Sequence, residues 1–246
     1  YGPGAAEKLL LGLEEDFGTI APVVTMNRIL QGYIDLGRME AAEAFLELRL
    51  RQLEPIRSEI PARSFPDEAT VNILLKGFVK MAKNDPKAPQ IAHDRLNSLA
   101  CELNIPASIQ SYGIILNTWS NCVGQRDDAA HHAEALLRGP ILDLYFEKPP
   151  RNSSFHEHNS NTTIQWNDKE EAMKDFTICV NIVLKCWSAQ ARKDFHTNKD
   201  HITSQHAVES ALQLLCEFLE SPSATHDSTG AKDLRQATGK PTDSTF

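Results

Sequence analysis

The chain has 246 residues, 41% of them hydrophobic, and a formal net charge of −8 at pH 7. The hydrophobic fraction excludes wholesale disorder and allows a sizeable buried core. The negative charge excludes a protein whose whole surface binds polyanions, although a local basic groove remains compatible with it. No apolar run approaches the roughly 18 residues that a membrane span requires, so we expect no membrane contact.

Four segments of the chain share one layout. They are VTMNRILQGY at 24–33, ATVNILLKGF at 69–78, QSYGIILNTW at 110–119 and ICVNIVLKCW at 178–187. In each segment the fourth residue is small or polar and the tenth is aromatic. Apolar residues recur three and four positions apart, which predicts amphipathic helices rather than strands.

A second, more acidic helical segment follows each of these first helices, and one more opens the chain. The second segments are 5–13, 41–50, 88–103, 129–137 and 207–219. An alanine followed by a leucine pair, as at 6–10, lets neighbouring helices approach closely. Because a lone helix pair cannot bury its apolar face, such pairs must stack on one another. We therefore expect an all-α solenoid of antiparallel helix pairs.

The predicted helical array covers residues 1–220. It consists of a half repeat at 1–22 and repeats at about 23–67, 68–108, 109–148 and 175–220. Residues 149–170 are expected to form a polar insert loop, and 221–246 a flexible segment that leads into a truncated next repeat. Since the chain lacks an initiator Met and opens directly into a helical pattern, we expect an internal fragment.

The sequence of the first repeat resembles that of a known repeat family. VTMN at 24–27, GY at 32–33, GRMEAA at 37–42 and FPD at 65–67 are similar to the pentatricopeptide repeat. That repeat typically reads V-T-Y-N-T-L-I-x-G-Y, then G-x-x-x-x-A, and closes on P-D. The rival tetratricopeptide repeat has a Trp…Leu-Gly…Tyr order that this chain lacks. The resemblance covers about 23–220 and implies a right-handed α-solenoid, although the repeats are longer and less regular here than in the family.

The resemblance also implies a function, namely single-stranded RNA binding at about one base per repeat. In the family this serves RNA processing, stability or translation in mitochondria or plastids. The small residue early in each first helix and the last residue of the repeat read the base, while an apolar residue clamps it. The base-reading candidates are Asn27, Asp67, Asn72, Ser108, Gly113 and Asn181, and the base-clamping candidates are Val24 and Ile178. This role requires asparagines that face open space.

Charge supports the same hypothesis. The first helices carry a small net positive charge and the second helices a larger net negative charge, and in the family the first helices line the inner surface. The phosphate candidates are Lys76, Lys80, Lys83 and Lys185. A solenoid whose faces merely differ in acidity would give the same pattern. The alternative function is a protein-interaction scaffold that uses the same groove, and in either case we expect a monomer.

No catalytic centre, cofactor or metal site is expected in these residues. The His-Glu-His run at 156–158 lies in a Ser/Asn-rich stretch without paired cysteines, which predicts a loop. The four aromatic residues of the first helices are expected to pack between helices rather than to stack on bases; they are Tyr33, Phe78, Trp119 and Trp187. The five cysteines form no CxxC pair, so most are expected to be buried thiols in a reducing compartment.

Overall fold

The computed structural model describes residues 2–146, 164–196 and 201–220. Every regular element in these ranges is helical, and the helices pack against one another, which confirms the all-α prediction. The chain divides into two compact units, Tyr1–Arg126 and Asp127–Phe246. This division falls inside the expected third repeat, 109–148, so each unit is described separately.

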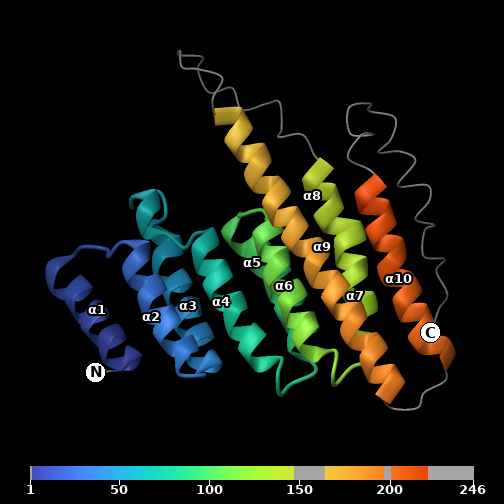
Figure 1. The fold of residues 1–246 in the computed structure, drawn as a ribbon. Helices are drawn as coiled ribbons and strands as arrows, with labels where there is room; N and C mark the ends of the chain where they lie inside the picture. Colours follow the sequence, from blue (N-terminus) through green and yellow to red (C-terminus); the bar gives the residue numbers. More distant parts are fainter. Residues whose placement is uncertain (1, 147–163, 197–200, 221–246) are drawn as a thin grey trace. The chain divides into compact units, whose positions relative to one another are not determined.

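The first unit is a row of helices in chain order (Figure 1). Its α-helices are α1 (Pro3–Phe17), α2 (Val23–Asp35), α3 (Met39–Leu53), α4 (Glu68–Met81), α5 (Ala88–Leu103) and α6 (Ile109–Cys122), with short turns η1 (Glu54–Ile56) and η2 (Ala62–Ser64) between α3 and α4. Helix α4 packs against both α2 and α6, while α3 packs on α2 and α5 on α4. The expected first helices therefore form one layer of this unit.

Local sequence signals explain where these helices begin and end. Asp67 caps α4 in a capping box with Thr70, and the Ser108 side chain caps α6. At the other end, Gly18 stops α1 with a φ of 60°, a left-handed conformation that glycine adopts without strain. Asn104, with a φ of 54°, does the same after α5. Caps thus fix the helix ends, and the apolar stripes fix the faces that are buried.

The aromatic residues of the first helices lie in the packed interior. Tyr33, Phe78, Trp119 and Trp187 are all buried, which confirms the prediction that they pack between helices. The Tyr33 ring lies 6.4 Å from that of Phe45 on α3. Its hydroxyl donates to the Glu7 carboxylate on α1, and burial together with this hydrogen bond raises the pKa of Tyr33 to about 12.

The second unit contains α7 (Ala129–Leu136), the π-turn η3 (Leu137–Ile141), α8 (Leu142–Phe146), α9 (Ile164–His196) and α10 (His201–Glu220). Helix α9 packs against α7 and α10. It begins at Ile164, inside the expected insert loop 149–170, so the prediction of a loop is wrong for the end of that segment. The rest of the insert, with the His-Glu-His run at 156–158, and the tail 221–246 lie outside the described residues.

The helix that starts at Ala129 is interrupted after Leu136. Gly139 has φ −98° and ψ −106°, which are not helical values, and Pro140 follows it. Because proline has no backbone N–H and its ring collides with the preceding turn, the regular α-helix cannot continue through this point. The predicted end of the second helix at residue 137 therefore agrees with the structure to within a residue.

The cysteines differ in exposure, which gives a first testable prediction. Cys122, Cys179 and Cys186 are buried, whereas Cys101 and Cys216 are exposed. Burial raises the pKa of Cys179 to about 12, so at pH 8 this thiol has almost no reactive thiolate. In the folded protein, we expect Ellman's reagent to modify Cys101 and Cys216 quickly and the other thiols only after unfolding in urea. Replacing Cys101 and Cys216 with serine should abolish the fast phase; a third fast thiol would contradict the assignment.

Candidate functional site

Asn27, the first base-reading candidate, lies at the junction between α2 and α4. Its side chain is only 8% exposed. The Thr70 hydroxyl donates to Asn27 Oδ1 at 2.8 Å, and Asn27 Nδ2 donates to Asp67 Oδ1 at 3.4 Å. The same Asp67 oxygen accepts the backbone N–H of Thr70 at 2.9 Å. The structure therefore brings the predicted pair Asn27 and Asp67 together, at the N-terminus of α4.

Asn72 makes an equivalent junction between α4 and α6. It is 7% exposed, and the Ser111 hydroxyl donates to Asn72 Oδ1 at 2.8 Å. Asn72 Nδ2 donates to the exposed Gln110 side chain at 3.1 Å. Ser108 lies 3.0 Å from Ser111, oxygen to oxygen, so the second predicted pair, Asn72 and Ser108, is connected through Ser111. Each junction joins an asparagine to the hydroxyl that stands three residues after the next N-cap.

These junctions correct one expectation. The prediction that the asparagines point into open space is wrong for Asn27 and Asn72. Each amide is buried and accepts a hydrogen bond from a hydroxyl at the start of the next first helix, α4 or α6. It holds for Asn181, which is exposed on α9. Gly113 is half-buried on α6 and has no side chain that could read a base.

The two base-clamping candidates are both on the surface. Val24 is 60% exposed in the first turn of α2, and Ile178 is exposed on α9, one turn before Asn181. Their place on the surface leaves them free to contact a ligand. Gln110, which aligns with Val24 in the repeated segments, is the exposed end of the Asn72 junction.

The lysines of α4 lie on an exposed face shared with α2. Lys80 Nζ is 2.8 Å from Asp35 Oδ1 on α2 and donates to the Ile34 carbonyl at 3.3 Å. This hydrogen bond lowers the pKa of the Asp35 carboxyl, and the exposed Asp35 carboxylate partly offsets the charge of Lys80. Lys76 is exposed on the same helix and Lys83 in the turn that follows it, and neither forms an ion pair within the described part of the chain. Of the phosphate candidates in this unit, Lys76 and Lys83 are the available ones.

Two further residues of this face were not foreseen. Arg28 is exposed on α2, four positions after Val24 and therefore on the same side of the helix. Asn117, exposed on α6, aligns with Lys76 in the repeated segments. Helical periodicity counted from the clamp position would have found both. We refer to the surface formed by Arg28, Lys76, Lys80, Lys83 and Asn117 as the basic face.

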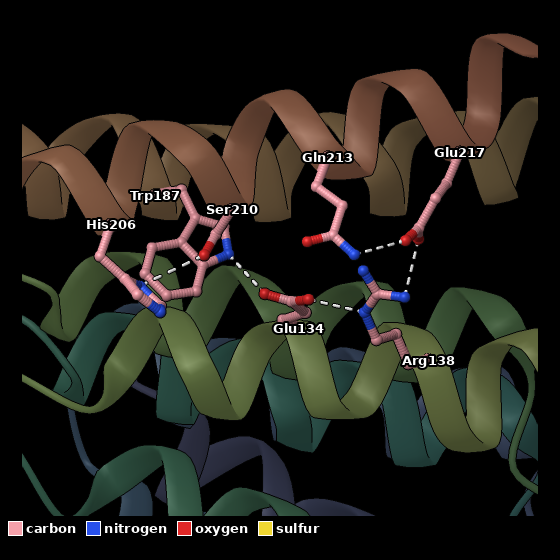
Figure 2. Close-up of polar contacts among 7 residues, drawn as sticks. All are labelled: Glu134, Arg138, Trp187, His206, Ser210, Gln213 and Glu217. Atoms are coloured by element: carbon pink, nitrogen blue, oxygen red, sulfur yellow. Dashed lines mark hydrogen bonds and ion pairs between the residues drawn. The ribbon is translucent and has the colours of Figure 1, made fainter. Parts of the chain in front are cut away.

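The second unit holds its helices together with a different polar cluster, shown in Figure 2. Trp187 Nε1 of α9 donates to Glu134 on α7 at 2.8 Å, and Arg138 Nε donates to the other oxygen of Glu134 at 2.6 Å. Arg138 also pairs with Glu217 of α10 at 2.7 Å. Since one guanidinium bridges two carboxylates on different helices, the cluster ties α7, α9 and α10 together. Lys185, the remaining phosphate candidate, is exposed on α9.

Among the described residues, no group of three or more His, Cys, Asp or Glu side chains is arranged to hold a metal ion. None of the described helices combines the length and apolarity of a membrane span. Comparison of the chain with protein-family models, curated proteins and solved structures finds no match. The resemblance to pentatricopeptide repeats therefore rests on the quoted residues alone.

Proposed function

We propose that the first unit binds single-stranded RNA along the basic face, mainly through the phosphate backbone. The observation that carries this proposal is the exposure of Lys76 and Lys83 without any carboxylate partner in the described structure. Cations of this kind attract a polyanion, because binding releases the counterions of the phosphates. Arg28 adds a guanidinium, whose planar donor fork suits phosphate oxygens.

The proposal includes the finer architecture that the resemblance implies. In it, the helix pairs continue as a right-handed superhelix, and α2, α4 and α6 line its inner surface. The layer formed by these three helices supports this arrangement, as does the repetition of the asparagine–hydroxyl junction. Organellar RNA processing, stability or translation is the setting that the family resemblance suggests.

Base reading has a smaller part in this proposal than in the family. Asn27 and Asn72 already use their carbonyl oxygens and one amide hydrogen within the protein, so little of either amide remains for a base. The more accessible members of the junctions are Asp67 and Gln110. We therefore expect sequence preference in the first unit to be weak and affinity to be sensitive to salt.

The test is fluorescence anisotropy of a labelled single-stranded RNA of mixed sequence, titrated with the full chain at several salt concentrations. Each of Lys76→Gln and Lys83→Gln is expected to lower the slope of log affinity against log salt by about 0.7, the value for one lost phosphate contact on a single strand. Lys8→Gln, an exposed lysine on α1, is the matched control and should leave the slope unchanged.

Two results would contradict the proposal. One is an affinity for single-stranded RNA that Lys76→Gln and Lys83→Gln both leave untouched, since the basic face would then not be the binding surface. The other is the absence of any salt-dependent RNA binding, which would leave the protein-interaction scaffold as the better hypothesis.

A further inference from the structure

An apolar groove of about 460 Å³ lies between α1 and α2. Its lining includes Pro3, Leu9 and Leu13 of α1 with Thr25, Ile29 and Gly32 of α2. Leu9 is 65% exposed and Leu13 46% exposed, and both line this groove. Contiguous exposed apolar surface of this kind marks interaction sites.

Helix α1 precedes α2 and packs against it, as α3 precedes α4 and packs against it. In the register of the repeated segments, Gly32 of α2 aligns with Gly77 of α4. A Cβ atom at Gly77 would meet Met39, the first residue of α3, and a Cβ atom at Gly32 would meet Pro3, the first residue of α1. In both pairs, therefore, the start of the earlier helix lies over the same glycine of the later one.

The two pairs differ in what occupies the groove beside them. Helix α2 packs against both α3 and α4, so a Cβ atom at Gly77 would also meet Ile34 of α2 at 3.3 Å. At Gly32 the same position meets only Pro3 among the described residues. The groove between α1 and α2 is thus an unoccupied equivalent of the groove that holds α2.

The hydroxyl of Thr25 points to the same conclusion. Thr25 aligns with Thr70 and Ser111, whose hydroxyls donate to Asn27 and Asn72 of the preceding first helix. Thr25 is exposed, and its hydroxyl makes no hydrogen bond within the described structure. The groove therefore offers a donor at the position where the two established junctions receive an asparagine.

The residues of α1 that line the groove correspond to residues of α3 in the same register. If Ala6 is aligned with Ala42, Leu9 of α1 takes the place of Phe45 on α3. Phe45 is fully buried and its ring lies against Tyr33 of α2. Leu9 has no such neighbour and is mostly exposed. An aromatic residue six positions after the asparagine of an incoming helix would cover it, as Tyr33 follows Asn27.

We propose that the groove between α1 and α2 binds an amphipathic helix of one defined pattern. The pattern is an asparagine, an aromatic residue six positions later and an aliphatic residue next to it, as in Asn27, Tyr33 and Ile34. The asparagine side-chain oxygen accepts a hydrogen bond from the Thr25 hydroxyl, the aromatic residue covers Leu9 and the aliphatic residue lies over Gly32. Burial of the exposed leucines drives the association, and the hydroxyl–amide pair sets its register.

The experiment uses the full chain and a fluorescently labelled peptide with the sequence of residues 22–53, which carries this pattern. We expect saturable binding in fluorescence anisotropy. Leu13→Glu should weaken binding by at least about tenfold, since it places a charge in an apolar contact, and Thr25→Val should weaken it by a smaller factor. Ile91→Glu on α5 is the matched control, because Ile91 has the same size as Leu13 and a similar exposed fraction, 43% against 46%. Asn27→Ala within the peptide should also weaken binding.

The possible failures are distinct. If Leu13→Glu leaves peptide binding unchanged, the peptide binds elsewhere, for example by displacing residues 22–53 of the chain itself. That result would overturn the proposal. The absence of peptide binding would also overturn it, as would self-association of the chain that Leu13→Glu abolishes, because the occupant would then be a second copy. Arg28 lines the groove and also belongs to the basic face. Leu13 and Thr25 lie outside the basic face, and their variants leave Arg28 unchanged, so a failure of RNA binding leaves this test unaffected.

Discussion

Replacing Arg49 with alanine is expected to destabilise the first unit by about 3–5 kcal/mol, the range for removing one partner of a buried ion pair. Arg49 is only 2% exposed on α3. It donates to both oxygens of Glu14 on α1, at 2.5 and 2.9 Å, and to Gln52 at 3.1 Å. Because Glu14 also accepts the backbone N–H of Ala21 at 2.7 Å, the arginine holds together α1, α3 and the connection to α2.

Hydrogen exchange of the backbone amides in α1 and α3 measures this effect locally, which suits a chain of two units. Arg51→Ala is the control, since Arg51 is exposed and lies 3.8 Å from Glu47; we expect a change of less than about 1 kcal/mol there. The double variant Arg49→Met with Glu14→Leu should recover much of the stability, because it removes both charges and keeps apolar volume. Equal effects of Arg49→Ala and Arg51→Ala would refute the assigned role.

The second large effect is expected for Trp187→Ala in the second unit, about 3–5 kcal/mol from the cavity left by a buried aromatic side chain. Trp187 is buried and lies edge-on to His131, with ring centroids 4.7 Å apart. Its indole N–H also donates to Glu134. Trp187→Phe should cost less, about 1–3 kcal/mol, because it keeps one packed aromatic ring while it removes the N–H donor and part of the indole volume.

Urea unfolding followed by circular dichroism is the measurement for these variants. Phe195→Ala is the control, since Phe195 lies on the same helix but is largely exposed, and we expect little change from it. If Trp187→Phe were as destabilising as Trp187→Ala, the hydrogen bond in the cluster of Figure 2 would outweigh the packing, contrary to this expectation.

Helix positions could be predicted from the sequence because they depend on local patterns. Apolar residues at helical spacing located α2, α4 and α6, and α5 occupies the predicted residues 88–103. The start of α9 was missed because the residues from Ile164 onward are mostly polar. They contain neither a proline nor a glycine that would stop a helix, and the helix therefore extends through them. Polar composition alone does not distinguish a loop from a solvent-exposed helical turn.

The candidate site was predicted less well because its side-chain contacts are not local. The Asn27 and Asn72 positions were found, but their burial depends on hydroxyls that stand 43 and 39 residues further along the chain. The capping patterns at Asp67 and Ser108 are visible in the sequence. Nothing local, however, indicates that the residue three positions after each cap also contacts the asparagine of the preceding first helix. The ion pair of Arg49 with Glu14 is long-range in the same sense, as it spans 35 residues.

The asparagine–hydroxyl junctions also limit how neighbouring helices can slide. Moving α4 along α2 by one helical turn, about 5.4 Å, would separate the buried Asn27 amide from Thr70 and Asp67, while Thr70 would keep its hydrogen bonds to Asp67 in the cap. Each unsatisfied group costs about 1–3 kcal/mol, whereas the leucine contacts would survive such a shift with different neighbours. A single buried asparagine sets the register of a coiled coil in this way. The junctions therefore select one alignment among several that apolar packing alone would tolerate.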